Sequence, residues 1–286
     1  MGQFHDSTMT THVTFDENGD NGLVVAGRYL PEELLSEIFC YVDHKSLLNC
    51  QLVCKRWKML IESYVWRKKA EILMGRLLKF KKDAPWHVYY LICKKKPFER
   101  NLLKNNSGQD GKRKYWSLVQ EGGDGWTVEN PPLGAPLLPN NESVFEGKQY
   151  CFSTSYSTCS KIQVIDLQAE GFSPYILDNL QPPIVVSEWY SCRWDCAAIY
   201  DCIWRLMGKD NNVLVSFEHH DVIEGERQNK WYYVSHTFQN YGPGVRKISF
   251  CHAGKDHAFW AGNYGSKMAG ACVSVKIPTV QHSENE

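Results

Sequence analysis

The sequence lacks several features that would place the protein in a membrane, in an oxidising compartment or on a nucleic acid. Its 32 basic residues are balanced by 32 acidic ones, so we expect no general affinity for nucleic acid or for an anionic membrane. No apolar signal segment opens it, no C-x-x-C pair occurs, and the 11 cysteines are odd in number. These absences favour reduced thiols in the cytosol or nucleus, and we expect a cytoplasmic protein without stable membrane insertion.

Signatures of catalysis and of metal or nucleotide binding are also missing. There is no G-x-S-x-G nucleophile elbow and no glycine-rich phosphate loop. Cys192, Cys196 and Cys202 do not have the close paired spacing that zinc needs. His219 and His220 are neighbours, and in a strand their side chains would point to opposite faces. We therefore expect no catalytic residues, no metal and no cofactor.

What the sequence does contain is enough apolar material for two modest domains, since 43% of its 286 residues are apolar and 13% are aromatic. Its composition changes along the chain. Residues 1–28 are rich in Asp, Asn, Thr and Gly and are expected to form a disordered tail. We expect a small helical module at 29–72, a helical linker at 73–97, an all-β domain at 98–278 and a flexible end at 279–286. The fold class is thus α+β in separate domains.

The helical module begins with an amphipathic pattern. Apolar residues recur at Leu34, Leu35, Ile38, Phe39 and Val42, which predicts a helix. Pro31 suits its first turn, and Tyr41 is its expected end. Ser46 is predicted to cap a second short helix, and apolar positions continue through a third. A module this small cannot bury all its leucines and tryptophans, so a partner surface is expected.

The same residues resemble an F-box. The order Leu30-Pro31, Leu34-Leu35, Ile38-Phe39 and VCKRW is typical of that motif. The resemblance implies docking onto a Skp-type adaptor and, through it, onto cullin and RING subunits of a ubiquitin ligase. The residues expected to contact the adaptor are Leu30, Pro31, Leu34, Leu35, Ile38, Phe39, Leu47, Leu48, Val53 and Trp57. The alternative is an ordinary helical hairpin within a larger core.

From about residue 101 onward, short segments dense in β-branched and aromatic residues alternate with turn residues, which predicts strands. The expected strands are Tyr115–Val119, Gln149–Phe152, Ile184–Trp189, Ile199–Leu206, Val213–Phe217, Trp231–Thr237, Arg246–Cys251, His257–Trp260 and Ala271–Ile277. So many strands favour an antiparallel sandwich of two sheets. The stretch Asp166–Gly171 could be strand or helix.

Six segments of this region carry a second resemblance: NLLKNNSG, EGGDGW, QVIDLQAEG, WYSCRWD, HTFQNYGPGVRKISFCHAGKD and FWAGNYG. Together they resemble the F-box-associated (FBA) domain of the sugar-recognising (Fbs) subgroup of F-box proteins. The resemblance implies an antiparallel β-sandwich. It also implies binding of the inner core of N-linked high-mannose glycans on misfolded glycoproteins, for ubiquitination and endoplasmic-reticulum-associated degradation.

A sugar offers polar edges and apolar faces, so its site needs aromatic platforms ringed by hydrogen-bonding groups. The resemblance assigns this role to Tyr156, Asp195 and the pair Phe259-Trp260. Phe259 lacks the hydroxyl of the family's tyrosine, Ala261 replaces a lysine, and Thr158 replaces a tryptophan. Two hydrogen-bond donors are thereby lost, each worth about 0.5–3 kcal/mol.

Three alternatives for this region stay open. Trp260 could pack in the core while Asp195 caps a turn. The sandwich could recognise a protein surface that carries no glycan. The chain could also be a carbohydrate-active enzyme, although nothing in the sequence shows that Glu188 and Asp195 flank one glycosidic bond.

Overall fold

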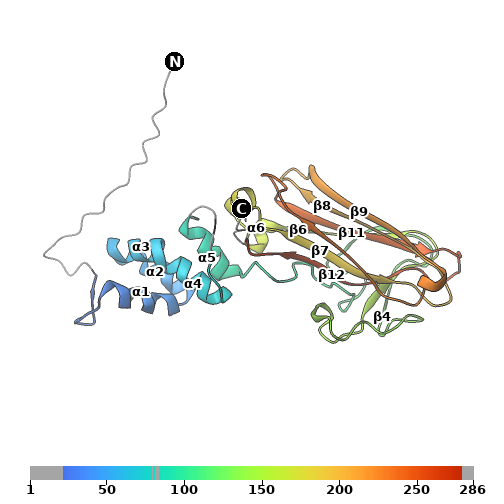
Figure 1. The fold of residues 1–286 in the computed structure, drawn as a ribbon, viewed down its shortest axis with the longest axis horizontal. Helices are drawn as coiled ribbons and strands as arrows, with labels where there is room; N and C mark the ends of the chain where they lie inside the picture. Colours follow the sequence, from blue (N-terminus) through green and yellow to red (C-terminus); the bar gives the residue numbers. More distant parts are fainter. Residues whose placement is uncertain (1–21, 79, 81–83, 279–286) are drawn as a thin grey trace, which may run out of the picture. The chain divides into compact units, whose positions relative to one another are not determined.

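The computed structural model describes residues 22–78, 80 and 84–278 and divides the chain into two compact units (Figure 1). The first unit comprises residues 1–78 and 84–94, and the second comprises 79–83 and 95–286. Most of the expected tail, residues 1–21, and the expected flexible end, 279–286, lie outside the described residues. Residues 22–29, by contrast, contain a hairpin of β1 (Val24–Val25) and β2 (Arg28–Tyr29).

The first unit is helical, as expected. It contains α1 (Glu32–Tyr41), α2 (His44–Cys50), α3 (Lys55–Leu60), a π-helical turn at Ile61–Val65, α4 (Trp66–Met74) and α5 (Trp86–Lys95). Pro31 stands at the N-cap of α1. The cap of α2 was predicted wrongly. Asp43, which has the extended backbone of an N-cap, accepts hydrogen bonds from the backbone N–H groups of Lys45 and Ser46.

Helix α5 belongs to this helical unit and is not a separate connector, so the expected linker at 73–97 is divided between the two units. The buried ring of Trp66 in α4 stacks on that of Trp86, with their centroids 6.3 Å apart, and meets the edge of Tyr90 at 5.3 Å. Within the described part of the chain, none of the helices combines the length and apolar character needed to cross a membrane.

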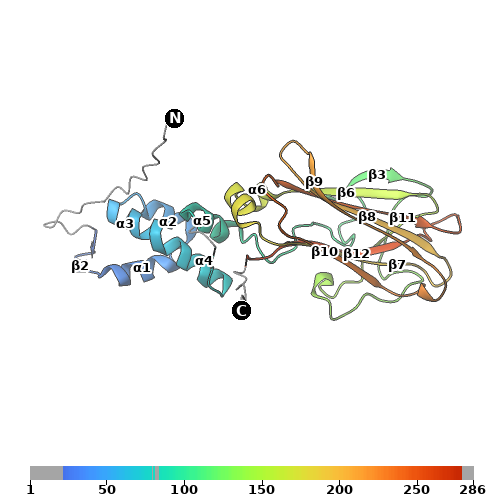
Figure 2. The ribbon, with the colours of Figure 1, turned by 45° about the horizontal axis from the view of Figure 1, so that its top comes forward.

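The second unit is an antiparallel sandwich of two five-stranded sheets, which confirms the predicted fold (Figure 2). The first sheet has the order β3 (Ser117–Glu121), β6 (Cys159–Asp166), β11 (Lys247–Asp256), β8 (Ala198–Met207) and β9 (Val213–Ile223). The second has the order β10 (Tyr232–Phe238), β7 (Ile184–Ser191), β12 (Lys267–Val275), β5 (Cys151–Ser153) and β4 (Thr127–Glu129).

Eight of the nine expected strands overlap observed ones, and the exception is His257–Trp260. That stretch is a loop, because the Asp256 carboxylate binds the backbone N–H groups of Phe259 and Trp260 and so competes with a β-ladder. Strands β4 and β6 were not predicted. The ambiguous stretch is mostly helix: β6 ends at Asp166, which caps the short helix α6 (Leu167–Glu170).

The strand registers bring five loops to one end of the sandwich. Each follows a strand of one sheet and enters the other sheet: β3 to β4, β5 to β6, β7 to β8, β9 to β10 and β11 to β12. Because all neighbouring strands are antiparallel, these connections meet at the same end of the sandwich. We call this end of the sandwich the loop end.

Among the described residues of this unit, the side chains of two lysines are fully buried, one with a charged partner and one without a hydrogen-bond acceptor. Lys267 donates to both carboxylate oxygens of Glu129, at 2.7 and 2.6 Å. The Lys161 ammonium has no hydrogen-bond acceptor among the described residues and faces the rings of Trp126 and Trp116, at 4.2 and 5.1 Å. Burial holds the pKa of Lys161 well below its ordinary value.

Candidate functional site

The β11–β12 loop presents two aromatic side chains at the loop end. Asp256, the buried last residue of β11, accepts from Phe259 N at 2.6 Å through Oδ1 and from Trp260 N at 3.1 Å through Oδ2. Phe259 takes the left-handed backbone conformation, with φ of 57°, which is unfavourable for a bulky residue and needs such support. The Phe259 side chain is 69% exposed and that of Trp260 is 46% exposed.

A chain of contacts links Trp260 to the β7–β8 loop. The ring of Trp260 meets that of Tyr264 edge to face, with centroids 5.7 Å apart. The guanidinium carbon of Arg193 lies 4.6 Å from the centre of the Tyr264 ring. Arg193 Nε and Nη2 donate to the two oxygens of Asp195 at 2.7 and 2.8 Å, and these bonds lower the pKa of Asp195. Asp195 is therefore ionised at neutral pH and held in place.

The β5–β6 loop is tied to the same place through Ser155. Its hydroxyl donates to Gly262 O at 2.7 Å and accepts from Asp124 N at 2.9 Å, while Asp124 Oδ2 accepts from Gly262 N at 2.7 Å. Tyr156 follows on this loop and lies against Gly123, where an added Cβ would come within 3.0 Å of its ring. These bonds join three of the five loops.

The structure thus places all four expected sugar-site residues, Tyr156, Asp195, Phe259 and Trp260, on loops of one end. Trp260 is not a core residue, and Asp195 pairs with Arg193. Whether the four bind a glycan remains a prediction. Sequence reasoning missed Arg193, Tyr264 and Asp256, although each lies within five residues of a predicted one, in the quoted runs WYSCRWD, HAGKD and FWAGNYG.

The carboxylate pair considered for a glycosidase is not assembled. Glu188 is fully buried between the sheets, where it accepts from Tyr200 Oη at 2.7 Å and lies 2.6 Å from His252 Nδ1. Asp195 lies on the loop outside. The two carboxylates cannot flank one solvent-accessible bond. Among residues 22–78, 80 and 84–278, no three His, Cys, Asp or Glu side chains form a cluster that could hold a metal.

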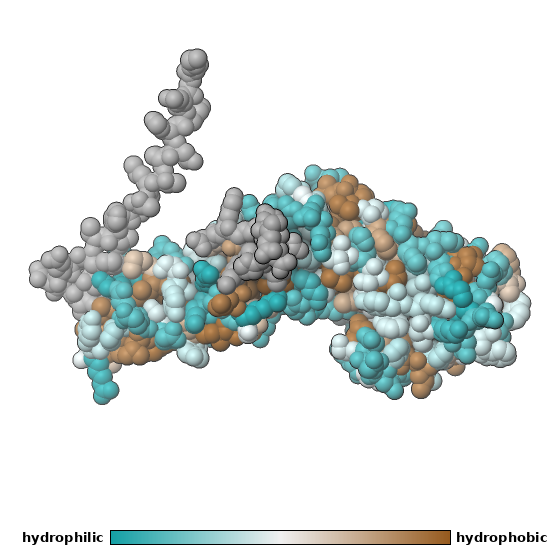
Figure 3. All heavy atoms as spheres, viewed as in Figure 1, coloured by the Kyte–Doolittle hydropathy of each residue, from teal (hydrophilic) through white to brown (hydrophobic). Residues whose placement is uncertain are grey.

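A second candidate surface lies on the helical unit, where apolar side chains gather over α1 (Figure 3). The expected adaptor-binding residues divide into two groups. The first group is at least partly accessible to a partner. It consists of four exposed residues, Pro31, Leu34, Ile38 and Val53, and three half-buried ones, Leu30, Leu48 and Trp57.

The other group consists of Leu35, Phe39 and Leu47, which are at most 3% exposed. These three side chains form the core of the unit itself and offer no surface to a partner. Sequence reasoning missed Tyr41 and Leu52, which are the most exposed apolar side chains beside the first group.

Comparisons with known proteins match both units. The model of the F-box-like family matches residues 28–71, and that of the F-box associated region matches residues 93–275. The chain is 39% identical to rat F-box only protein 6 in an alignment of 258 residues that covers 88% of this chain and 88% of that one. It is 37% identical to human F-box only protein 44 over 255 residues, covering 87% of this chain and 96% of that one. It is also 37% identical to bovine F-box only protein 2 over 261 residues, covering 86% and 83%.

Proposed function

Because this chain belongs to the F-box proteins that carry an F-box associated region, we propose that it is the substrate-recognition subunit of a Skp–cullin–F-box ubiquitin ligase. Its helical unit binds the Skp-type adaptor, and its sandwich binds the inner core of N-linked high-mannose glycans on misfolded glycoproteins in the cytoplasm. The subunit breaks no bond. It raises the effective concentration of substrate lysines near the ubiquitin-charged enzyme, and the substrates are then degraded.

The adaptor part of this proposal is supported by the exposed side chains of Leu34, Ile38, Leu52 and Val53. Exposed apolar side chains that gather on a surface are costly in a free chain and are typical of an interaction site. Pro31 extends it at the start of α1.

The glycan part is supported above all by the Phe259-Trp260 turn fixed by Asp256. Trp260 can stack on the C–H face of a sugar, and Asp195 has carboxylate lone pairs beyond those bonded to Arg193. Arg193 likewise has N–H groups that Asp195 does not occupy, because a guanidinium carries five. Arg193 can therefore supply donors of the kind that Ala261 and Phe259 lack.

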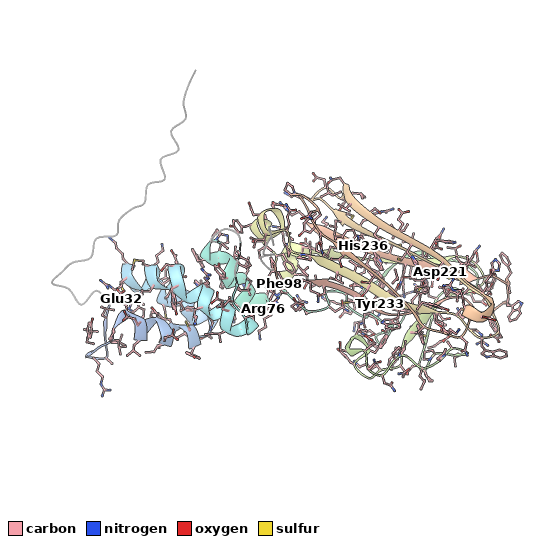
Figure 4. All side chains as sticks on the ribbon, in the orientation of Figure 1. Glu32, Arg76, Phe98, Asp221, Tyr233 and His236 are labelled. Carbon is pink, nitrogen blue, oxygen red and sulfur yellow. The ribbon has the colours of Figure 1, made fainter. Side chains whose placement is uncertain are left out.

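A glycan array probed with the full-length chain, bound to its adaptor, tests the glycan part. We expect binding to high-mannose glycans that contain the chitobiose core, and loss of that binding in Trp260→Ala. The matched control is Tyr233→Ala, which removes an exposed aromatic ring of β10 that is not among the four expected sugar-site residues (Figure 4). A signal that survives Trp260→Ala would contradict the assignment of the site.

A second candidate function is recognition of a protein surface without a glycan. The observation that favours it is Ala261, which stands where the sugar-binding members of the family carry a lysine. A blank array from a chain that still binds the adaptor and a substrate protein would support this candidate instead.

A further inference from the structure

Trp194 is the most exposed tryptophan at the loop end, and the site described above does not use it. Its side chain is 65% exposed at the tip of the β7–β8 loop, between Arg193 and Asp195. A tryptophan is usually buried over most of its surface. A ring this exposed lacks the hydrophobic stabilisation that contact with a ligand would give it.

The backbone of Trp194 is held on two sides. Its N–H donates to Gly134 O at 2.9 Å. The side-chain amide of Gln228, from the β9–β10 loop, donates to the carbonyls of Arg193 and Trp194 at 3.2 and 3.3 Å. The bidentate pair of Arg193 and Asp195 fixes the residues on either side. The exposed ring is thus presented from an ordered backbone, which lowers the entropy that a ligand contact would cost.

The loop that carries Trp194 is in contact with the loop that carries Trp260. Arg193 lies over Tyr264, and Tyr264 contacts Trp260. Trp194 stands between Arg193 and Asp195 in the sequence, on the same loop as this ion pair. The pair offers both donors and acceptors, and its two charges cancel.

We propose that Trp194 is a second aromatic platform, which binds sugars beyond those on Trp260 and makes the site select extended glycans over the core disaccharide. This inference rests on the proposed glycan-binding function. Two exposed aromatic rings on neighbouring loops, together with a hydrogen-bonding pair without net charge, suit a neutral oligosaccharide, whose successive rings each offer an apolar face and hydroxyl groups. Trp194 would then determine specificity, and Trp260 would supply the basal affinity.

Calorimetric titration of the adaptor-bound full-length chain with two free ligands, chitobiose and a high-mannose glycan that contains it, tests the proposal. We expect Trp194→Ala to weaken binding of the large glycan about tenfold and to change chitobiose binding less than about twofold. Trp194→Phe should recover part of the loss, because it keeps an aromatic face. Tyr233→Ala is the control and should change neither. Equal thermal midpoints would show that the variants are folded.

Several outcomes would overturn the inference. Equal weakening of both ligands would place Trp194 on the core sugars, and no weakening would mean that it contacts no sugar. A loss seen only when an intact glycoprotein is titrated in the same way would assign the ring to the polypeptide. If the large glycan binds and Trp260→Ala abolishes binding while Trp194→Ala does not weaken it, only this inference fails. If the unmodified chain binds neither ligand, the proposed function fails with it.

Discussion

Leu34 and Leu35 are neighbours in α1, but the side chain of Leu34 is 55% exposed and that of Leu35 is 2% exposed. The two residues therefore serve different purposes although they belong to one apolar pattern. Leu35 stabilises the helical unit, and Leu34 is available to a partner.

The double variant Leu34→Glu with Ile38→Glu should lose the adaptor and keep its fold, because both side chains are exposed and charges there would be buried at the interface. Affinity measured with the purified Skp-type adaptor should fall at least tenfold, with an unchanged thermal midpoint.

Leu35→Ala is the matched comparison. It should cost about 2–5 kcal/mol of stability, since it leaves a cavity in the core. Adaptor binding that withstands both glutamates would refute the assignment of this surface.

Asp256→Ala should weaken glycan binding and destabilise the sandwich, because two backbone N–H groups lose a charged acceptor. Each such bond contributes about 1.5–3 kcal/mol. Asp256→Asn keeps one acceptor oxygen, so its stability and its glycan affinity should lie between those of the unmodified protein and those of Asp256→Ala. Urea denaturation and glycan titration measure the two effects, and a fully stable Asp256→Ala would show that the turn does not depend on this carboxylate.

Lys161→Met should stabilise the sandwich by about 1–3 kcal/mol at pH 7, since it replaces a buried amine that has no acceptor among the described residues. Because burial lowers the pKa of Lys161, the unfolded chain binds that proton more readily than the folded chain does. The stability of the unmodified protein should therefore rise with pH up to the ordinary lysine pKa of about 10.4. The gain from Lys161→Met should shrink over that range.

Urea denaturation of both forms at pH 7 and pH 9 measures this difference. A destabilised variant without a pH dependence would mean that Lys161 is charged and bound to the surrounding rings.

Lys267→Met should destabilise the sandwich, because it leaves the buried Glu129 carboxylate without its charged partner. The expected loss is about 3–5 kcal/mol. Adding Glu129→Leu should restore most of that loss, and a double-mutant cycle by urea denaturation gives the coupling energy. Additive losses would show that the two side chains do not stabilise each other.

The sequence was sufficient for the division into a helical and a β region, because helical periodicity at Leu34–Val42 and the alternation of later strands are local signals. Periodicity could not separate Leu34 from Leu35, since it marks an apolar pattern without saying what covers each residue. Aromatic composition misplaced a strand at His257–Trp260, where a side-chain carboxylate outcompetes the ladder.

The link between Arg193 and Tyr264 could not be predicted either. The two residues are 71 positions apart in the sequence, and only the pairing of β7 with β12 brings their loops together.

Each of the five connections at the loop end crosses from one sheet to the other. We therefore expect the thickness of the sandwich, which the volume of its interior side chains determines, to affect the spacing of the aromatic rings there. A substitution deep between the sheets should then alter which ligand fits the proposed site without touching that ligand.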